Sequence, residues 1–352
     1  MLKEGKLPIP ELTELISFQG AKISGTIILP GIGLDASAIN PEIANTYCKK
    51  FYDSEDECFL IIKSDPITFS TSNPGKFSII INANDISCLG GVPYGCTITL
   101  LIPPGNSFDI VKKIQCEIHD TCKNIGISIL GGHTEITSSV NQIIISLSMI
   151  GFVPHNFLPS RVISEGNVLI LCGFIGNEGT VILSQEINNK FDKIIFELKE
   201  INRLEELLYV GDTALKLNKV LKPLLIHDPT EGGVLGAIYE LFRGLENEIG
   251  VNIFKNSLDR HIHPFTRKIS DLLDIDPLRL ISSGALLLII SSDQMDNFKT
   301  IIKDFFIPIS VIGEVKDKKI MFDDNTPIKP PESDELIQGF KNLEKIIEKN
   351  NL

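Results

Sequence analysis

The sequence lacks several features that would place it quickly in a functional class. Tryptophan is absent, and 33 basic residues stand against 45 acidic ones, which gives a formal net charge of −12. A protein that binds a phosphate backbone needs a basic face, so this charge argues against a nucleic-acid-binding function. The abundant Ile, Lys and Asn that accompany the missing Trp are typical of an AT-rich genome and indicate no function.

Long apolar runs and targeting signals are also missing. The longest apolar run, Ala285–Ile290, suits a buried strand and is far shorter than the roughly 20 residues of a membrane-spanning helix. Pro8 and Pro10 interrupt the first residues, which do not resemble a secretory signal. The seven cysteines form no CxxC pair and do not indicate a disulfide framework. We therefore expect a cytoplasmic protein that binds neither a membrane nor nucleic acid.

Length and element order predict two domains. A chain of 352 residues is too long for one ordinary core. Strand-like apolar runs alternate with helical patterns in both halves, which indicates an α/β protein with mixed sheets. We expect an N-terminal arm and glycine loop over residues 1–35, a first domain over 36–155 and a second domain over 160–352, joined by residues 154–159.

Four acidic strings are the most informative feature of the chain. They read GIGLDASAI around Asp35, KSDPITF around Asp65, NANDISCLGGVP around Asp85 and HDPTEGGVLGA around Asp228. Asp is a common residue of turns and caps, so one such string would carry little weight. Four together favour a site for Mg²⁺ bound to a polyphosphate, because this ion takes hard oxygen ligands.

Local patterns place the first-domain carboxylates at the ends or edges of elements. Asp65 is expected just past the end of a strand over residues 58–62. Residues 76–89 are predicted to form a buried helix, because their apolar positions recur at helical steps. Asn84 and Asp85 would lie on the polar edge of this helix.

The string around Asp228 follows a strand and precedes a helix. Thr230 is expected to cap this helix, and the helix N-terminus would then face an anion.

The string from Gly131 to Glu135 reads GGHTE and is predicted to form a loop directly after a strand. Gly131 and Gly132 have no Cβ, so the backbone could approach a ligand closely. Thr134 and Glu135 offer a hydroxyl and a carboxylate. His133 is either a general base or phosphate donor, since its pKa is ordinarily near neutrality, or a residue that only fills the loop.

Well-known nucleotide motifs do not occur. The stretch Gly173-x-x-Gly176-x-x-Gly179 matches neither G-x-G-x-x-G nor G-x-x-x-x-G-K-[ST], so no Rossmann or Walker-A site is indicated. A nucleophile elbow and a zinc-protease helix are also absent.

The four strings in this order, with SSGALL at residues 282–287, resemble one superfamily. It contains aminoimidazole ribonucleotide synthetase, selenophosphate synthetase, thiamine-monophosphate kinase and the hydrogenase-maturation protein HypE. The likeness extends from about Gly31 to Val315, and the amino-acid strings are most similar to those of HypE-like proteins. It implies a two-domain PurM-like fold, with an N-terminal domain that forms a dimeric β-barrel and a C-terminal α/β domain.

The resemblance also implies ATP and Mg²⁺ as ligands and a homodimer as the assembly. The metal would be held by Asp35, Asp65 and Asp85, and the catalytic residues would be His133, Asp85 and Glu135. The residues implied to bind ATP are Gly31, Gly33, Asn84, Gly131, Gly132, Thr134, Asp228, Thr230, Gly232 and Gly233.

The sequence departs from its relatives in ways that affect the acceptor. HypE proteins that dehydrate a carbamoyl group end in a Cys that carries it, whereas the last cysteine here is Cys172. We therefore do not expect a self-carried carbamoyl group. Selenophosphate synthetases need a reactive Cys or Sec beside a Lys, and no Cys precedes Gly31. His133 replaces the Asp of the usual GGDT string and removes one potential metal ligand.

Two functional hypotheses follow. The first is an ATP- and Mg²⁺-dependent enzyme that phosphorylates a small or protein-borne acceptor, and the intact aspartates favour it. The second is a non-catalytic dimeric nucleotide-binding partner or regulator in a maturation complex, which the missing terminal Cys favours.

Overall fold

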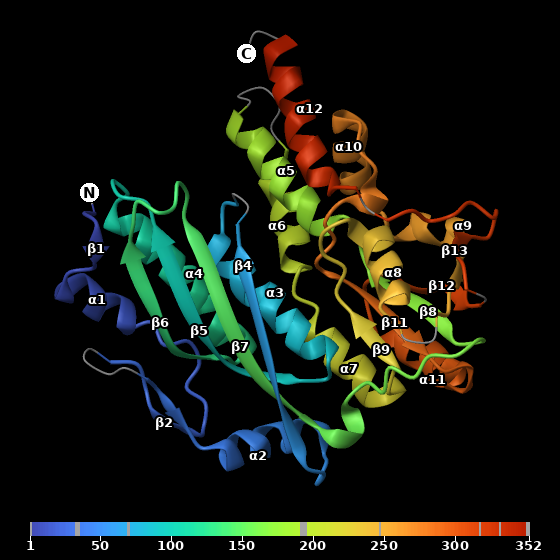
Figure 1. The fold of residues 1–352 in the computed structure, drawn as a ribbon, viewed down its shortest axis with the longest axis horizontal. Helices are drawn as coiled ribbons and strands as arrows, with labels where there is room; N and C mark the ends of the chain where they lie inside the picture. The colour runs from blue at the N-terminus through green and yellow to red at the C-terminus, as the bar shows by residue number, and fades with distance from the viewer. Residues whose placement is uncertain are drawn as a thin grey trace. The chain divides into compact units, whose positions relative to one another are not determined.

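The computed structural model describes residues 2–31, 36–68, 71–190, 196–245, 248–316, 318–330 and 332–349. The chain divides into two compact units, Met1–Leu158 and Pro159–Leu352. Each unit has its own sheet and its own core (Figure 1). The mixed α/β class predicted from the sequence is confirmed.

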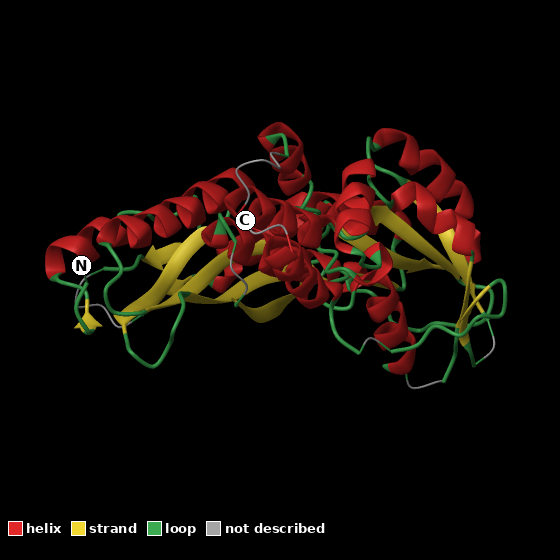
Figure 2. Cartoon of the chain, turned by 90° about the horizontal axis from the view of Figure 1, so that it is seen from above, coloured by secondary structure: helices red, strands yellow, loops and turns green. Residues whose placement is uncertain are grey.

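The first unit contains a five-stranded sheet in the order β1-β6-β5-β7-β4, and β2 pairs separately with β3. Helices α3 and α4 lie on one side of the five-stranded sheet (Figure 2). The strands are β1 (Gly5–Lys6), β2 (Thr26–Ile28), β3 (Ala38–Ile39), β4 (Cys58–Ile67), β5 (Val92–Ile102), β6 (Ser128–Ile136) and β7 (Ile144–Pro154). The helices are α1 (Ile9–Ile16), α2 (Pro41–Tyr52), α3 (Pro74–Cys88), α4 (Phe108–Ile125) and the short 3-10 helix η1 (His155–Phe157).

The N-terminal segment contains more regular structure than the arm predicted for residues 1–35. Its helix α1 buries Leu15, and β1 pairs with the end of β6. The backbone N–H of Leu2 donates to the carbonyl oxygen of Asn106. The described part of this segment is therefore built into the first unit through backbone hydrogen bonds, which its polar, Pro- and Gly-containing sequence did not indicate.

Helix α3 is buried along almost its whole length. Phe77 and Ile86 are among its fully enclosed side chains, and the helix packs on β4, β5 and β7. Its first turn is held by α4, because the Glu117 carboxylate accepts from the backbone N–H of Gly75 at 3.0 Å. A negative charge is favourable at a helix N-terminus. The helix predicted for residues 76–89 is confirmed and begins two residues earlier.

Two strands extend further than the sequence indicated. β4 does not end before Asp65, because its pairing with β7 continues to Ile67. Pro66 lacks an N–H, which an edge strand tolerates. β6 runs through the predicted loop from Gly131 to Glu135, because these residues pair in parallel with β5. The face on which each of these side chains lies is therefore set by strand alternation.

The second unit contains a six-stranded sheet in the order β13-β10-β12-β8-β11-β9. The strands are β8 (Val168–Gly173), β9 (Leu225–His227), β10 (Val251–Ile253), β11 (Ala285–Ile290), β12 (Ile309–Val315) and β13 (Ile320–Phe322). The longer helices are α5 (Asn177–Lys190), α6 (Leu198–Glu206), α7 (Gly211–Leu221), α8 (Gly233–Arg243), α10 (Pro264–Leu273) and α12 (Glu335–Lys349). The shorter ones are α9 (Lys255–Leu258), α11 (Met295–Ile301), η2 (Asp259–His261), η3 (Pro277–Arg279), η4 (Ser292–Gln294) and η5 (Ile302–Asp304).

The core of the second unit forms around β11, whose residues are all buried. This strand pairs with β8 on one side and β9 on the other, and α8 contributes Val234, Ile238 and Phe242 to the same cluster. A run of apolar residues without polar alternation is expected for a strand covered on both faces. Within the described ranges, no helix has the length and hydropathy needed to cross a lipid bilayer.

The two adjacent glycines of β6 have different surroundings. A Cβ on Gly132 would clash with the carbonyl oxygen of Ile98 on β5, which is a backbone atom and cannot move aside easily. A Cβ on Gly131 would meet only the Thr97 methyl group, at 3.9 Å, an ordinary contact. Close packing of β6 on β5 therefore requires a glycine at Gly132 and not at Gly131.

We predict that Gly132→Ala lowers the free energy of unfolding by about 1–3 kcal/mol, as expected for overpacking against a rigid neighbour. Gly131→Ala is the matched control and should leave stability nearly unchanged. Urea unfolding of the two variants and the wild type measures both effects. Equal losses in the two variants would contradict this account of β6.

Candidate functional site

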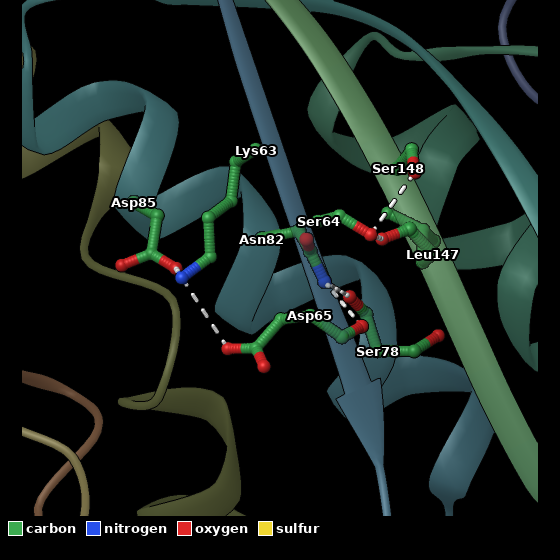
Figure 3. A network of polar contacts seen from close by, with 8 residues as sticks. All are labelled: Lys63, Ser64, Asp65, Ser78, Asn82, Asp85, Leu147 and Ser148. Carbon is green, nitrogen blue, oxygen red and sulfur yellow. Dashed lines mark hydrogen bonds and ion pairs between the residues drawn. The ribbon is translucent and has the colours of Figure 1, made fainter.

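Two carboxylates from different elements meet at one lysine. Lys63 and Asp65 are two residues apart on β4, so both project from the face on which α3 packs. Ser64, between them, points to the other face and accepts a hydrogen bond from the Ser148 hydroxyl. Helix α3 brings Asp85 to the first face. The Lys63 Nζ lies 2.9 Å from an Asp85 carboxylate oxygen and 3.5 Å from one of Asp65 (Figure 3).

This cluster of Lys63, Asp65 and Asp85 is partly open to solvent. The side chains of Lys63 and Asp65 are each 36% exposed, and that of Asp85 is 22% exposed. Burial by itself lowers the pKa of Lys63, but the hydrogen bond and charge of Asp85, joined by Asp65, outweigh burial and raise the pKa above its ordinary value. The lysine is therefore charged at neutral pH, and Asp85 and Asp65 both face this charge.

Two asparagines of α3 lie beside the cluster. The Asn82 amide nitrogen donates to the carbonyl oxygens of Ser78, at 2.9 Å, and Asp65, at 3.4 Å, which joins the helix to β4 (Figure 3). The Asn82 Oδ1 is buried and has no hydrogen-bond partner in the part of the chain that the structure describes. Asn84 is fully buried, so its predicted place on a polar edge is wrong: the helix is enclosed at this position.

The donor set of the cluster fits Mg²⁺. This ion commonly takes one or two carboxylates and completes its shell with water and phosphate oxygens. Asp65 and Asp85 already converge on one cationic group. Among the described residues, no group of three or more His, Cys, Asp or Glu side chains could hold a metal ion alone. The predicted ligand Asp35 and the predicted nucleotide contact Gly33 lie outside the described residues, directly after Gly31.

Gly132 and Thr134 share a sheet face with Asp65 but lie across the sheet from it. Strand pairing places Asp65, Leu147, Ile98 and Gly132 in one lateral row. Thr134, two residues further along β6, projects from the same face. Since β6 and β4 are three strand spacings apart, about 14 Å separates the two ends of this row.

His133 and Glu135 project from the opposite face of the sheet. They alternate with Gly132 along β6, and the His133 Nε2 lies 3.5 Å from a Glu135 carboxylate oxygen. Both side chains are about half exposed. Within the first unit, the structure therefore brings these two residues together but does not bring them to Asp85.

In the second unit, Asp228 is buried directly after β9. The chain then makes a turn in which the backbone N–H of Gly233 donates to the carbonyl oxygen of Thr230. The N-cap of α8 is Gly232, with a φ of 76°, so the predicted capping role of Thr230 is wrong. The extra turn moves the start of the helix past Thr230, and its left-handed backbone is one that glycine adopts without strain.

A buried carboxylate, not identified from the sequence, holds this turn in place. Asp334 accepts from the backbone N–H groups of Gly232 at 2.7 Å, Ile281 at 3.3 Å and Leu336 at 2.7 Å. It thereby ties the Gly232 turn to the start of α12. An Asp immediately before a helix is the sequence signal for such a residue.

The second unit also encloses an ionisable side chain on α5. Glu178 is buried, and its Oε2 has no hydrogen-bond partner within the described ranges. The pKa of Glu178 is raised to about 7, mainly by burial and also by Glu231 and Asp334, while hydrogen bonding with Ser283 opposes the shift. This carboxyl is therefore largely protonated below neutral pH.

Lys63 is the main site residue that sequence reasoning missed. The signal was present in the KSD string, since residues i and i+2 of a strand share a face. The assumption that the strand ended before Asp65 removed that signal.

Comparison with known proteins identifies the family. Residues 52–153 match the model for the N-terminal domain of AIR synthase related proteins, and residues 164–323 match the model for the C-terminal domain. Together the two matches cover most of the chain. The chain belongs to the AIR synthase related family.

Individual relatives show which members of this family the chain is similar to. The chain is 27% identical over 241 residues to a putative hydrogenase expression/formation protein of Methanocaldococcus jannaschii, covering 68% of each chain. It is 24% identical over 271 residues to the carbamoyl dehydratase HypE of Escherichia coli, covering 72% of this chain and 74% of that protein. A crystal structure of Escherichia coli HypE aligns with a TM-score of 0.72 at 18% identity, covering 94% and 99% of the two chains. The structure of a HypE in complex with ATP aligns with a TM-score of 0.63 at 18% identity, over 82% and 94%.

The raised pKa of Glu178 predicts a pH-dependent stability. Between pH 4.5 and about 7 the unfolded carboxyl is ionised while the folded one stays protonated. The unfolded state then binds fewer protons, so stability falls as pH rises through this window, by roughly 3 kcal/mol in all. Glu178→Gln, which mimics the protonated carboxyl, should remove this loss.

Urea unfolding of the wild type and the variant at several pH values between 4.5 and 7.5 measures the difference. Glu186→Gln, on the same helix but paired with Lys190, is the matched control and should keep the wild-type slope. A wild-type slope in the Glu178→Gln variant would show that this carboxyl ionises normally in the folded protein.

Proposed function

We propose that the protein is an ATP- and Mg²⁺-dependent enzyme that transfers the terminal phosphoryl group of ATP to a small or protein-borne acceptor, activating a carbonyl- or amide-type oxygen. The observation that carries the proposal is the convergence of Asp65 and Asp85 on one cationic group. Family membership and the ATP complex of a HypE support ATP as the nucleotide.

Each proposed role uses a property of the side chain. Asp65 and Asp85, with Asp35, would hold Mg²⁺, and the ion would neutralise charge on the phosphates. The buried contacts of α3 keep Asp85 in place, so little reorganisation is needed when the ligands bind. Catalysis would come mainly from positioning and charge neutralisation, as in other phosphoryl transfers.

The remaining predicted residues are proposed as nucleotide contacts. The glycines among these residues have no Cβ, so the phosphates could approach their backbone closely. This set comprises Gly31, Gly33, Asn84, Gly131, Gly132, Thr134, Asp228, Thr230, Gly232 and Gly233.

We also propose a homodimer, formed through the exposed edge of the first unit. Leu60 and Ile62 lie on β4, an edge strand, and their side chains are 52% and 67% exposed on the open face of the sheet. Exposed apolar edge strands favour pairing with another chain. His133 and Glu135 lie on this open face, away from Asp85 of their own unit, so we propose that they act in the site of the second copy.

A direct assay tests the proposed reaction. We predict that the protein with Mg²⁺ and ATP releases ADP, with water taking the phosphoryl group as inorganic phosphate where no acceptor is supplied. Asp85→Asn should lower the rate by about 100-fold or more, since a metal-binding charge is lost while the shape is kept. Asp109→Asn, at an exposed position of α4, is the matched control and should leave the rate unchanged.

Calorimetric titration with ATP and Mg²⁺ separates the two functional hypotheses. Tight ATP binding without ADP release, with all acceptors tried, would favour the nucleotide-binding regulator. The absence of any ATP binding would contradict both hypotheses.

The dimer is tested by a charge at the edge strand. We expect Ile62→Asp to shift the protein from dimer to monomer in light scattering coupled to size-exclusion chromatography, because a carboxylate would have to be buried without a partner. Ile9→Asp is the control, since Ile9 is similarly exposed (66%) but lies on α1. A monomeric wild type, or a dimeric Ile62→Asp variant, would refute this interface.

A further inference from the structure

The Lys63 ammonium lies where a cation held by Asp65 and Asp85 would lie. It approaches oxygens of both carboxylates, at 2.9 and 3.5 Å, from the same strand that carries Asp65. A lysine does not leave its site as a free ion does, so any divalent cation that takes these carboxylates must coexist with the ammonium nearby. Two like charges at such distances repel each other strongly.

The consequence depends on what accompanies the cation. Free Mg²⁺ would bring only positive charge and would meet the full repulsion of Lys63. Mg²⁺ on a polyphosphate brings additional anionic oxygens, and the three N–H donors of an ammonium can bind them. The partial exposure of Lys63 gives its head group room to turn from Asp85 towards such oxygens.

A structural role accounts for only part of the position of this lysine. The Asp65 side chain is 36% exposed, so its charge is tolerated without an ion pair, and only the Asp85 oxygen that faces Lys63 is buried. Partly exposed ion pairs contribute little to folding stability. The attachment of α3 to β4 does not depend on Lys63 alone, because the helix packs along β4 and the Asn82 amide also donates to the backbone of Asp65.

We propose that Lys63 is a positioning residue that makes the Asp65–Asp85 pair selective for Mg²⁺ carrying a polyphosphate over free Mg²⁺. This inference rests on the proposed function of the same site. It assigns the coupling of metal and nucleotide binding to one side chain.

Metal binding in the absence of nucleotide tests this directly. Mn²⁺ replaces Mg²⁺ as the probe, and its free concentration is followed by electron paramagnetic resonance during titration of the protein. Lys63→Met should bind free Mn²⁺ about tenfold more tightly than the wild type, because one repelling charge is removed. Lys63→Arg keeps the charge and should bind free Mn²⁺ as weakly as the wild type.

A second titration uses Mn²⁺ with inorganic triphosphate or with the β,γ-methylene analogue of ATP. Lys63→Met should bind the metal–triphosphate complex about tenfold more weakly than the wild type does. The substitution should therefore strengthen the binding of free Mn²⁺ and weaken the binding of the complex. Lys112→Met is the matched control, since Lys112 pairs with Glu14 on the surface, and it should alter neither titration. If Lys63→Met is poorly folded by thermal unfolding, Lys63→Gln takes its place.

The outcomes separate this inference from the proposed function. If the wild type binds no metal–nucleotide complex, the proposed function fails, while the free-metal titration still reports on Lys63. Unchanged or weakened binding of free Mn²⁺ in both Lys63→Met and Lys63→Gln would overturn the role of Lys63.

Discussion

The packing of α3 on the sheet of the first unit determines where the candidate site forms. Nearly every side chain of this helix is enclosed, with Phe77, Ile79 and Ile86 among the most deeply buried. A slip of one residue would rotate the helix by roughly 100° and expose this apolar surface. Asp85 therefore has one stable position, against β4 and within reach of Lys63.

Electrostatics then act on a geometry that packing has already set. The cluster of Lys63, Asp65 and Asp85 combines opposite charges at the boundary between core and solvent, where interactions are stronger than in bulk water but desolvation is incomplete. Such a position leaves the charged groups partly accessible to ions in solution. In the second unit, by contrast, Glu178 is enclosed and the nearby charges of Glu231 and Asp334 are themselves negative, so burial changes its protonation instead.

The sequence predicted the elements that have a strong local period and missed those that depend on pairing. Residues 76–89 were recognised as a helix because their apolar pattern is dense and helical. The extension of β4 past Asp65 and of β6 through His133 depends on neighbouring strands, and Pro and Gly in these strings suggested loops. The cap at Gly232 depends on a turn geometry that the string itself does not specify.

The candidate site was predicted in part for the same reason. The strings around Asp65 and Asp85 indicated a shared ligand, and the structure brings these two residues together. Lys63 and Asp334 each had a local signal, but their other partners, Asp85 for Lys63 and Gly232 for Asp334, lie far away in the sequence, so their roles were not identified. His133 was assigned to a loop near the carboxylates, whereas the alternation of β6 directs it to the other face.

The contacts of Asp334 have a consequence for how the protein is made. Its carboxylate holds the turn at Gly232, which precedes it by 102 residues. During synthesis on the ribosome, this turn emerges long before its anchor does. The turn at Gly232 therefore receives this anchor only after Asp334 has left the exit tunnel.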